Sequence, residues 1–90
     1  MNLLEVFVHP GCLSERSAMV LARELQAVWS ALDVKIWSLP EASERAQALG
    51  VIVAPAFVLD GTIIAVGVPR KEWLVAKLQE FGIKACGLPP

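Results

Sequence analysis

A short junction between two periodic patterns constrains this chain more than any other stretch. Residues 3–9 are almost all apolar and rich in strand formers, which predicts a strand buried on both faces of a sheet. Residues 13–32 carry apolar side chains at helical spacing. Pro10 and Gly11 break the first pattern before the second begins. The sequence therefore predicts a strand, a tight turn and a helix, with Cys12 at the N-terminus of the helix.

The segment after this helix predicts a second strand and a short helix. Residues 34–39 alternate well enough for a strand. Ser38-Leu39-Pro40-Glu41 matches a capping box with proline in the first turn, so we expect the helix to begin at once. Gly50 is expected to end it in a left-handed conformation. Because a helix joins the first two strands, they should be parallel, with a right-handed crossover.

The C-terminal half predicts a hairpin followed by a last helix. Residues 51–59 are apolar and β-branched, and Asp60-Gly61 is a strong hairpin signal that leads into a strand at 62–66. Pro69 is expected to open the last helix and Gly82 to end it. The predicted order is β-α-β-α-β-β-α. This is an α/β fold whose four-stranded mixed sheet is covered by helices.

Length and composition describe one globular domain. Ninety residues suffice for a single domain, which we place at 1–82, followed by a tail at 83–90. The hydrophobic share of 56% argues against disorder, and a net charge of −1 without a basic run argues against binding to nucleic acid or an anionic membrane. No targeting segment is visible, and the longest apolar run is too short to span a bilayer. We expect a cytoplasmic protein.

No metal or cofactor site is expected from the sequence. The two cysteines, Cys12 and Cys86, lie far apart, and no Cys/His pair has zinc-ligand spacing. Metal binding by Cys12, Glu15 and a distant-looking His9 would leave an incomplete ligand set that needs a dimer to complete it. We therefore treat metal binding as the weakest hypothesis.

Four local groups of residues stand in a recognisable order. A strand ends in Gly11-Cys12 just before a long helix, and Ala48-Leu49-Gly50-Val51 leads to Ala54-Pro55. Phe57–Gly61 forms the predicted hairpin, and Val66-Gly67 precedes the last helix. Together these groups resemble the small thioredoxin/glutaredoxin-like proteins, in which a short helix leads to a cis-proline, and the resemblance covers roughly residues 3–81. The resemblance implies a thioredoxin-like fold and thiol–disulfide exchange.

One departure from the family alters the expected site. The family's redox motif is Cys-x-x-Cys, and here it is Cys12-Leu13-Ser14-Glu15. The resemblance therefore implies a nucleophile at Cys12 but no resolving thiol. The helix N-terminus favours the thiolate, and so would Arg16 if it folded back, whereas the Glu15 carboxylate disfavours it. The alternative is that Cys12 is a buried, inert residue at the start of a helix.

The resemblance also assigns residues outside the cysteine motif. It implies that Pro55 is cis and faces Cys12, and that the main chain of Ala54 pairs with the substrate; the alternative for Pro55 is an edge-strand or bulge proline. Two candidates are weaker: His9, whose own chemistry could make it a cation or base near the thiolate, and the pair Arg70-Lys71, which the resemblance places where glutaredoxins hold glutathione. We favour ordinary surface roles for all three.

Cys86 is a poor resolving thiol in the layout that the resemblance implies. The last helix would carry the chain about 20 Å away from Cys12. We therefore interpret Cys86 as a tail residue, with pairing between chains of a homo-oligomer left open.

Two functional hypotheses follow. In the first, Cys12 is the single nucleophile of a redox protein, in the manner of monothiol glutaredoxins. It would form mixed disulfides with glutathione or a protein thiol, while Ala54 and Pro55 position the partner and an external thiol completes the cycle. In the second, the chain is a non-enzymatic interaction or assembly module that docks a protein partner through the apolar residues 51–53 beside Ala54-Pro55. We favour the redox hypothesis by a small margin.

Overall fold

The computed structural model describes residues 2–29 and 31–82, which form four strands and three helices around one sheet. The strand β1 spans Asn2–Val8, and the long helix α1 follows at Leu13–Val28. The other elements are β2 (Leu32–Ser38), α2 (Ser43–Leu49), β3 (Ala56–Leu59), β4 (Thr62–Val66) and α3 (Lys71–Glu80). This is the element order that the sequence predicts.

The strands form one mixed sheet in the order β2-β1-β3-β4. β1 runs parallel to β2, with Leu4 opposite Val34, and antiparallel to β3, with Phe7 opposite Ala56. β3 and β4 form the antiparallel hairpin, in which an irregularity shifts the register between Phe57 and Val58. The predicted α/β fold with a four-stranded mixed sheet is therefore confirmed.

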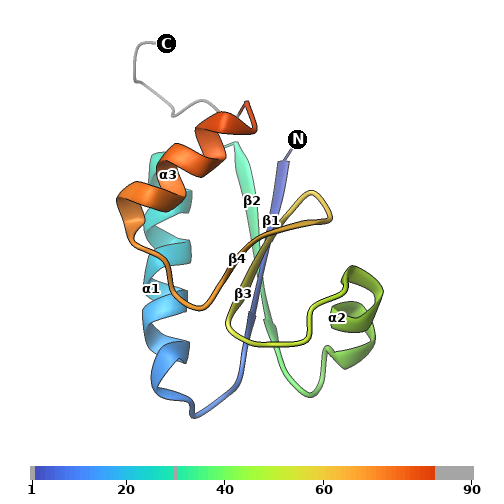
Figure 1. Cartoon of the computed structure of the whole chain (residues 1–90). Helices are drawn as coiled ribbons and strands as arrows, with labels where there is room; N and C mark the ends of the chain where they lie inside the picture. The colour runs from blue at the N-terminus through green and yellow to red at the C-terminus, as the bar shows by residue number, and fades with distance from the viewer. Residues whose placement is uncertain (1, 30, 83–90) are drawn as a thin grey trace.

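Helices cover both faces of the sheet, with α1 and α3 on one face and α2 on the other (Figure 1). Side chains of β1 alternate between the two sides, as the pleat of a strand requires. Leu4, Val6 and Val8 belong to the larger core beneath α1 and α3, whereas Phe7 belongs to the smaller core beneath α2. This double coverage explains why β1 is an almost unbroken apolar run.

The first helix is shorter than its apolar periodicity predicts. It ends at Val28, and Leu32 is already the first residue of β2, where it pairs with Asn2. The periodicity misleads because Leu32 remains in the same core as the helix residues after the chain has changed direction. β2 accordingly begins before the predicted strand at 34–39.

The capping-box prediction at Ser38-Leu39-Pro40-Glu41 is wrong. Ser38 is the last residue of β2, and α2 begins only at Ser43. The intervening residues form a turn, in which the Ala42 N–H donates to the Ser38 carbonyl at 2.9 Å. Ser38 belongs to β2 and does not cap a helix, because the sheet continues to this residue, which lies opposite Val8.

The third strand and the last helix also begin later than predicted. The third strand is confined to Ala56–Leu59, because residues 51–55 form a loop. Arg70, rather than Pro69, caps the N-terminus of α3. Among the described residues, no helix is both long enough and apolar enough to cross a bilayer.

Two predicted glycine turns are confirmed. Gly50 ends α2 with φ of +80°, and the Val51 N–H donates back to the Ala46 carbonyl, as in a Schellman motif. Asp60 and Gly61 both have positive φ, of 48° and 86°, which is the pattern of the type I′ hairpin turn. The residue types at these two turns therefore predict correctly where α2 ends and where β3 turns into β4.

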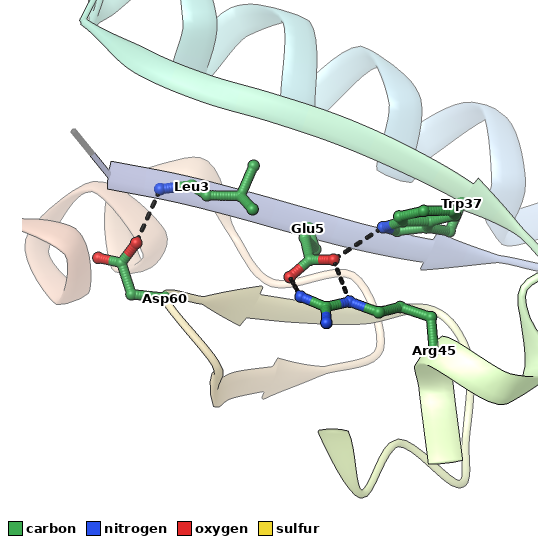
Figure 2. A network of polar contacts seen from close by, with 5 residues as sticks. All are labelled: Leu3, Glu5, Trp37, Arg45 and Asp60. Atoms are coloured by element: carbon green, nitrogen blue, oxygen red, sulfur yellow. Dashed lines mark hydrogen bonds and ion pairs between the residues drawn. The ribbon is translucent and has the colours of Figure 1, made fainter. Parts of the chain in front are cut away.

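A buried carboxylate ties α2 to the sheet, and the sequence analysis missed it. Glu5 lies in the middle of β1 and is 1% exposed. Arg45 of α2 donates to both of its oxygens at 2.8 Å, and Trp37 of β2 donates from Nε1 at 2.9 Å (Figure 2). The hydrogen bond from the Arg45 guanidinium is the main cause that holds the pKa of Glu5 below its usual value. The cluster therefore keeps a charge inside the fold by binding it from two neighbouring elements.

Candidate functional site

The predicted turn before the long helix is present, and it is built by its proline and glycine. The Cys12 N–H donates to the His9 carbonyl at 3.2 Å, and Gly11 has φ of +82°. Proline at the second position and a positive φ at the third are the signature of a type II turn. Pro10 and Gly11 therefore form the tight turn that connects the end of β1 to the start of α1.

Cys12 is the N-cap residue of α1, as the sequence predicts. Its backbone is extended, with φ of −73° and ψ of 147°, and its side chain makes no capping hydrogen bond. The residue is exposed, which contradicts the alternative of a buried cysteine. The first N–H groups of a helix have no acceptor within the helix, so they give this end a partial positive charge. The thiol is therefore accessible at the open N-terminus of the helix.

Glu15 lies one helical turn from Cys12 and binds the turn that carries the cysteine. Its Oε1 accepts a hydrogen bond from the Gly11 N–H at 3.0 Å, and its own N–H donates to the Cys12 carbonyl at 3.1 Å. The sequence analysis treated Glu15 as a charge near the thiol. The structure gives its carboxylate a specific main-chain partner as well.

Arg16 is exposed on the first turn of α1 and borders a groove between α1 and the start of α3. The groove has a volume of about 400 Å³, and Val68 and Lys71 line its other side. Lys71 forms an ion pair with Glu24 at 3.0 Å. This pairing is the ordinary surface role that the sequence analysis favoured for Lys71.

The loop at Ala54-Pro55 lies at the same end of the sheet as Cys12. The pairing of Phe7 with Ala56 places the residue before β3 beside the end of β1. The Ala54–Pro55 peptide bond is cis, and the Pro55 carbonyl accepts a hydrogen bond from Gly67 at 2.7 Å. This hydrogen bond joins the loop before β3 to the end of β4, in the lower half of the view in Figure 1.

Apolar side chains are exposed in the segments that meet at this end. Leu13, next to Cys12, is 98% exposed, and Ile52, in the loop before Ala54, is 94% exposed. Val51 does not belong to this surface, because it is buried in the core beneath α2. Sequence patterns could not separate Val51 from its neighbours, since all three are β-branched and apolar. The other exposed large apolar residues of these segments are Val53, Val66 and Val68.

Other sequence candidates contribute less to the site. The His9 side chain is exposed, and its carbonyl is the part that serves the turn. Cys86 lies outside the described residues. Within residues 2–29 and 31–82, no group of three His, Cys, Asp or Glu side chains could hold a metal ion.

Comparisons of sequence find no relative, whereas comparisons of structure find many. No protein-family model and no curated protein matches the chain. A mutant thioredoxin from Halobacterium salinarum superposes with a TM-score of 0.77 at 24% identity, over 99% of this chain and 78% of that one. The thioredoxin NaTrxh from Nicotiana alata has a TM-score of 0.72 at 26% identity, over 88% and 71%. The protein has the thioredoxin fold.

A third neighbour with this fold comes from a structure of the thiol resolving mechanism in yeast mitochondrial 1-Cys peroxiredoxin via glutathione/thioredoxin systems. It has a TM-score of 0.74 at 19% identity and covers 88% of this chain and 77% of that one. These neighbours confirm the thioredoxin-like resemblance given by the sequence.

Proposed function

We propose that the protein is a thioredoxin-like redox protein that acts through Cys12 as a single nucleophile. The observation that carries the proposal is the exposed Cys12 at the N-terminus of α1, on a fold shared with thioredoxins. Glu15 stands at the position that the second cysteine of the family would occupy. A mixed disulfide on Cys12 would therefore need an external thiol for its release.

The proposed cycle has two exchange steps. The Cys12 thiolate attacks one sulfur of a disulfide, a new S–S bond forms to Cys12, and the other sulfur leaves as a thiolate that takes a proton from water. A second thiolate, from glutathione or a protein, then attacks the partner's sulfur in the mixed disulfide. That step releases the Cys12 thiolate and a new disulfide, so no electrons are gained or lost over the cycle.

The surface around Cys12 favours an extended protein segment as the partner. Leu13, Ile52 and Val53 expose apolar surface, which a segment with apolar side chains would cover. Ala54 would offer its main chain to that segment, and Pro55 would set the shape of the loop. Glutathione remains the natural external thiol for the release step.

The first experiment compares the alkylation rate of Cys12 at neutral pH in the folded protein and after unfolding in denaturant, in a Cys86→Ser background so that one thiol is observed. We expect the folded protein to react faster, because the helix N-terminus is lost on unfolding. The same protein should form a mixed disulfide with a peptide disulfide, detected by mass spectrometry, and Cys12→Ser should abolish it. A folded protein that reacts no faster than the unfolded chain, or whose thiol does not react at all, would contradict the redox function.

The second candidate is a protein-interaction module that has lost catalysis. The exposure of Leu13 and Ile52 favours it, since a docking surface needs apolar area and no reactive thiol. Under this hypothesis Cys12→Ser leaves partner binding intact, whereas Ile52→Ser weakens it. Pull-down of one identified partner with both variants separates the two functions.

A further inference from the structure

In the turn that carries Cys12, each main-chain N–H group of residues 10–12 has an identified acceptor. Pro10 has no N–H, and the Cys12 N–H donates to the His9 carbonyl. The Gly11 N–H lies between them, and its acceptor is the Glu15 side chain at 3.0 Å. The turn is thus held at its centre by a residue that lies four positions further along the chain.

Glu15 makes this contact from the usual position of a capping-box glutamate but with an unusual partner. It is the third residue of α1, from which a glutamate commonly reaches back to the N–H of the N-cap residue. Here the N-cap is Cys12, and its N–H is already bound to His9. Glu15 therefore reaches one residue further, to Gly11, while its own N–H binds the Cys12 carbonyl. The two bonds bracket the cysteine and leave its side chain unused.

We propose that Glu15 is a positioning residue for the chemistry of Cys12. By accepting the Gly11 N–H, its carboxylate fixes the turn so that the thiol is presented above the open N-terminus of α1. This inference rests on the proposed function and assigns a task to the residue that replaces the second cysteine. This task belongs to the acceptor oxygen of Glu15 and is separate from any effect of its charge.

Three variants in the Cys86→Ser background separate position from charge. Glu15→Gln keeps an acceptor oxygen at the same reach and removes the charge. Glu15→Asp keeps the charge but is one methylene too short for Gly11. Glu15→Ala removes both. Unfolding curves for each variant identify any that does not fold, and the two conservative variants answer the question without Glu15→Ala.

Two measurements are made on each variant. Amide hydrogen exchange at Gly11 reports the hydrogen bond directly. The rate of Cys12 with a neutral disulfide, taken at a pH where the thiol is fully ionised, reports presentation without the effect of charge on ionisation. Glu15→Asp and Glu15→Ala should raise exchange at Gly11 by about fivefold or more and lower the limiting rate by a similar factor. Glu15→Gln should stay close to the parent in both.

The outcomes separate this inference from the proposed function. Equal exchange at Gly11 in the parent and in Glu15→Asp would overturn the positioning role, and so would equal limiting rates in Glu15→Gln and Glu15→Asp. The exchange measurement does not need a reactive thiol. If Gly11 behaves as expected but the parent never forms a mixed disulfide, the redox function fails while the contact made by Glu15 stands.

Discussion

Two carboxylates of the protein, Glu5 in the interior and Glu15 beside the thiol, are held by different kinds of hydrogen-bond donor. Glu5 is buried in β1 and is held by side chains from two other elements, Arg45 and Trp37 (Figure 2). Glu15 is only half-buried, and a single main-chain N–H from the adjacent turn donates to it. The contacts of Glu5 join segments that are far apart in the sequence, whereas the contact of Glu15 shapes the turn from His9 to Cys12.

This difference predicts which property each region controls. The Glu5 cluster fixes α2 against the sheet, so its loss should reduce stability and leave the Cys12 turn intact. The Cys12 end exposes its cysteine and its apolar side chains, so changes there should cost little stability and alter reactivity or binding. The comparison would fail if changes at the Glu5 cluster altered the reactivity of Cys12 and changes at the Cys12 end reduced stability.

The largest loss of stability is expected at the buried cluster. Glu5→Gln removes the charge that Arg45 binds and places an amide donor against the guanidinium. Because hydrogen bonds to charged groups are the stronger class, we expect a loss of about 2 kcal/mol in the free energy of unfolding. Denaturant unfolding measures the loss, and the alkylation rate of Cys12 should not change.

A double variant provides the control for this result. Arg45→Leu alone leaves a buried carboxylate without its main partner and should destabilise the protein more than Glu5→Gln does. Adding Glu5→Leu removes the stranded charge and should recover much of the loss. If the double variant is as unstable as Arg45→Leu, the cluster contributes through shape rather than charge.

Acid should weaken the same cluster. The folded state holds the pKa of Glu5 below its unfolded value, because Arg45 and Trp37 bind the ionised form. This contribution is complete above the unfolded value, about 4.5, and is lost as the pH falls through the lower folded value. Stability should therefore fall on acidification below about pH 4.5. The fall should be shallower in Glu5→Gln, and parallel curves for the two proteins would contradict this account.

Local rules in the sequence explain the parts of the fold that were predicted well. Asp60-Gly61 and Gly50 adopt the predicted turns because their conformations depend on neighbouring residues. Ser38 is the counterexample, since it satisfies a local capping pattern but pairs opposite Val8 across the sheet. That partner is 30 residues away, so a local pattern gives no information about the strand pairing that keeps Ser38 in β2.

The candidate site was predicted in position but not in its contacts. Cys12 follows from the change of periodicity at Pro10-Gly11, and its place at the start of α1 is confirmed. The bond from Gly11 to Glu15 depends on the detailed shape of the turn, which residue types alone do not specify. The pairing of Glu5 with Arg45 spans 40 residues and becomes visible only when α2 is packed on the sheet.

A smaller effect on stability is expected at the hairpin turn. Asp60 accepts hydrogen bonds from the Leu3 N–H at 2.8 Å and from the Asn2 side chain at 2.6 Å, which ties the start of β1 to the turn. Asp60→Ala should cost about 1 kcal/mol, because both bonds lie at the exposed edge of the fold. Asp60→Asn keeps an acceptor and tolerates the positive φ, so it should cost less. Equal losses in thermal unfolding would assign the effect to the carboxylate charge alone.

The smallest change in stability, and the sharpest test of the Cys12 end, is expected at Leu13. Its side chain is 98% exposed, so Leu13→Ser should alter the free energy of unfolding by less than about 0.5 kcal/mol. If Leu13 contacts the partner, the variant should slow mixed-disulfide formation with an apolar peptide disulfide and leave the rate with glutathione disulfide unchanged. Val20→Ser, on the same helix and 48% exposed, is the matched control and should affect neither rate. Equal slowing with both disulfides would show that Leu13 acts on the thiol, and the apolar surface would then no longer be evidence for a protein partner.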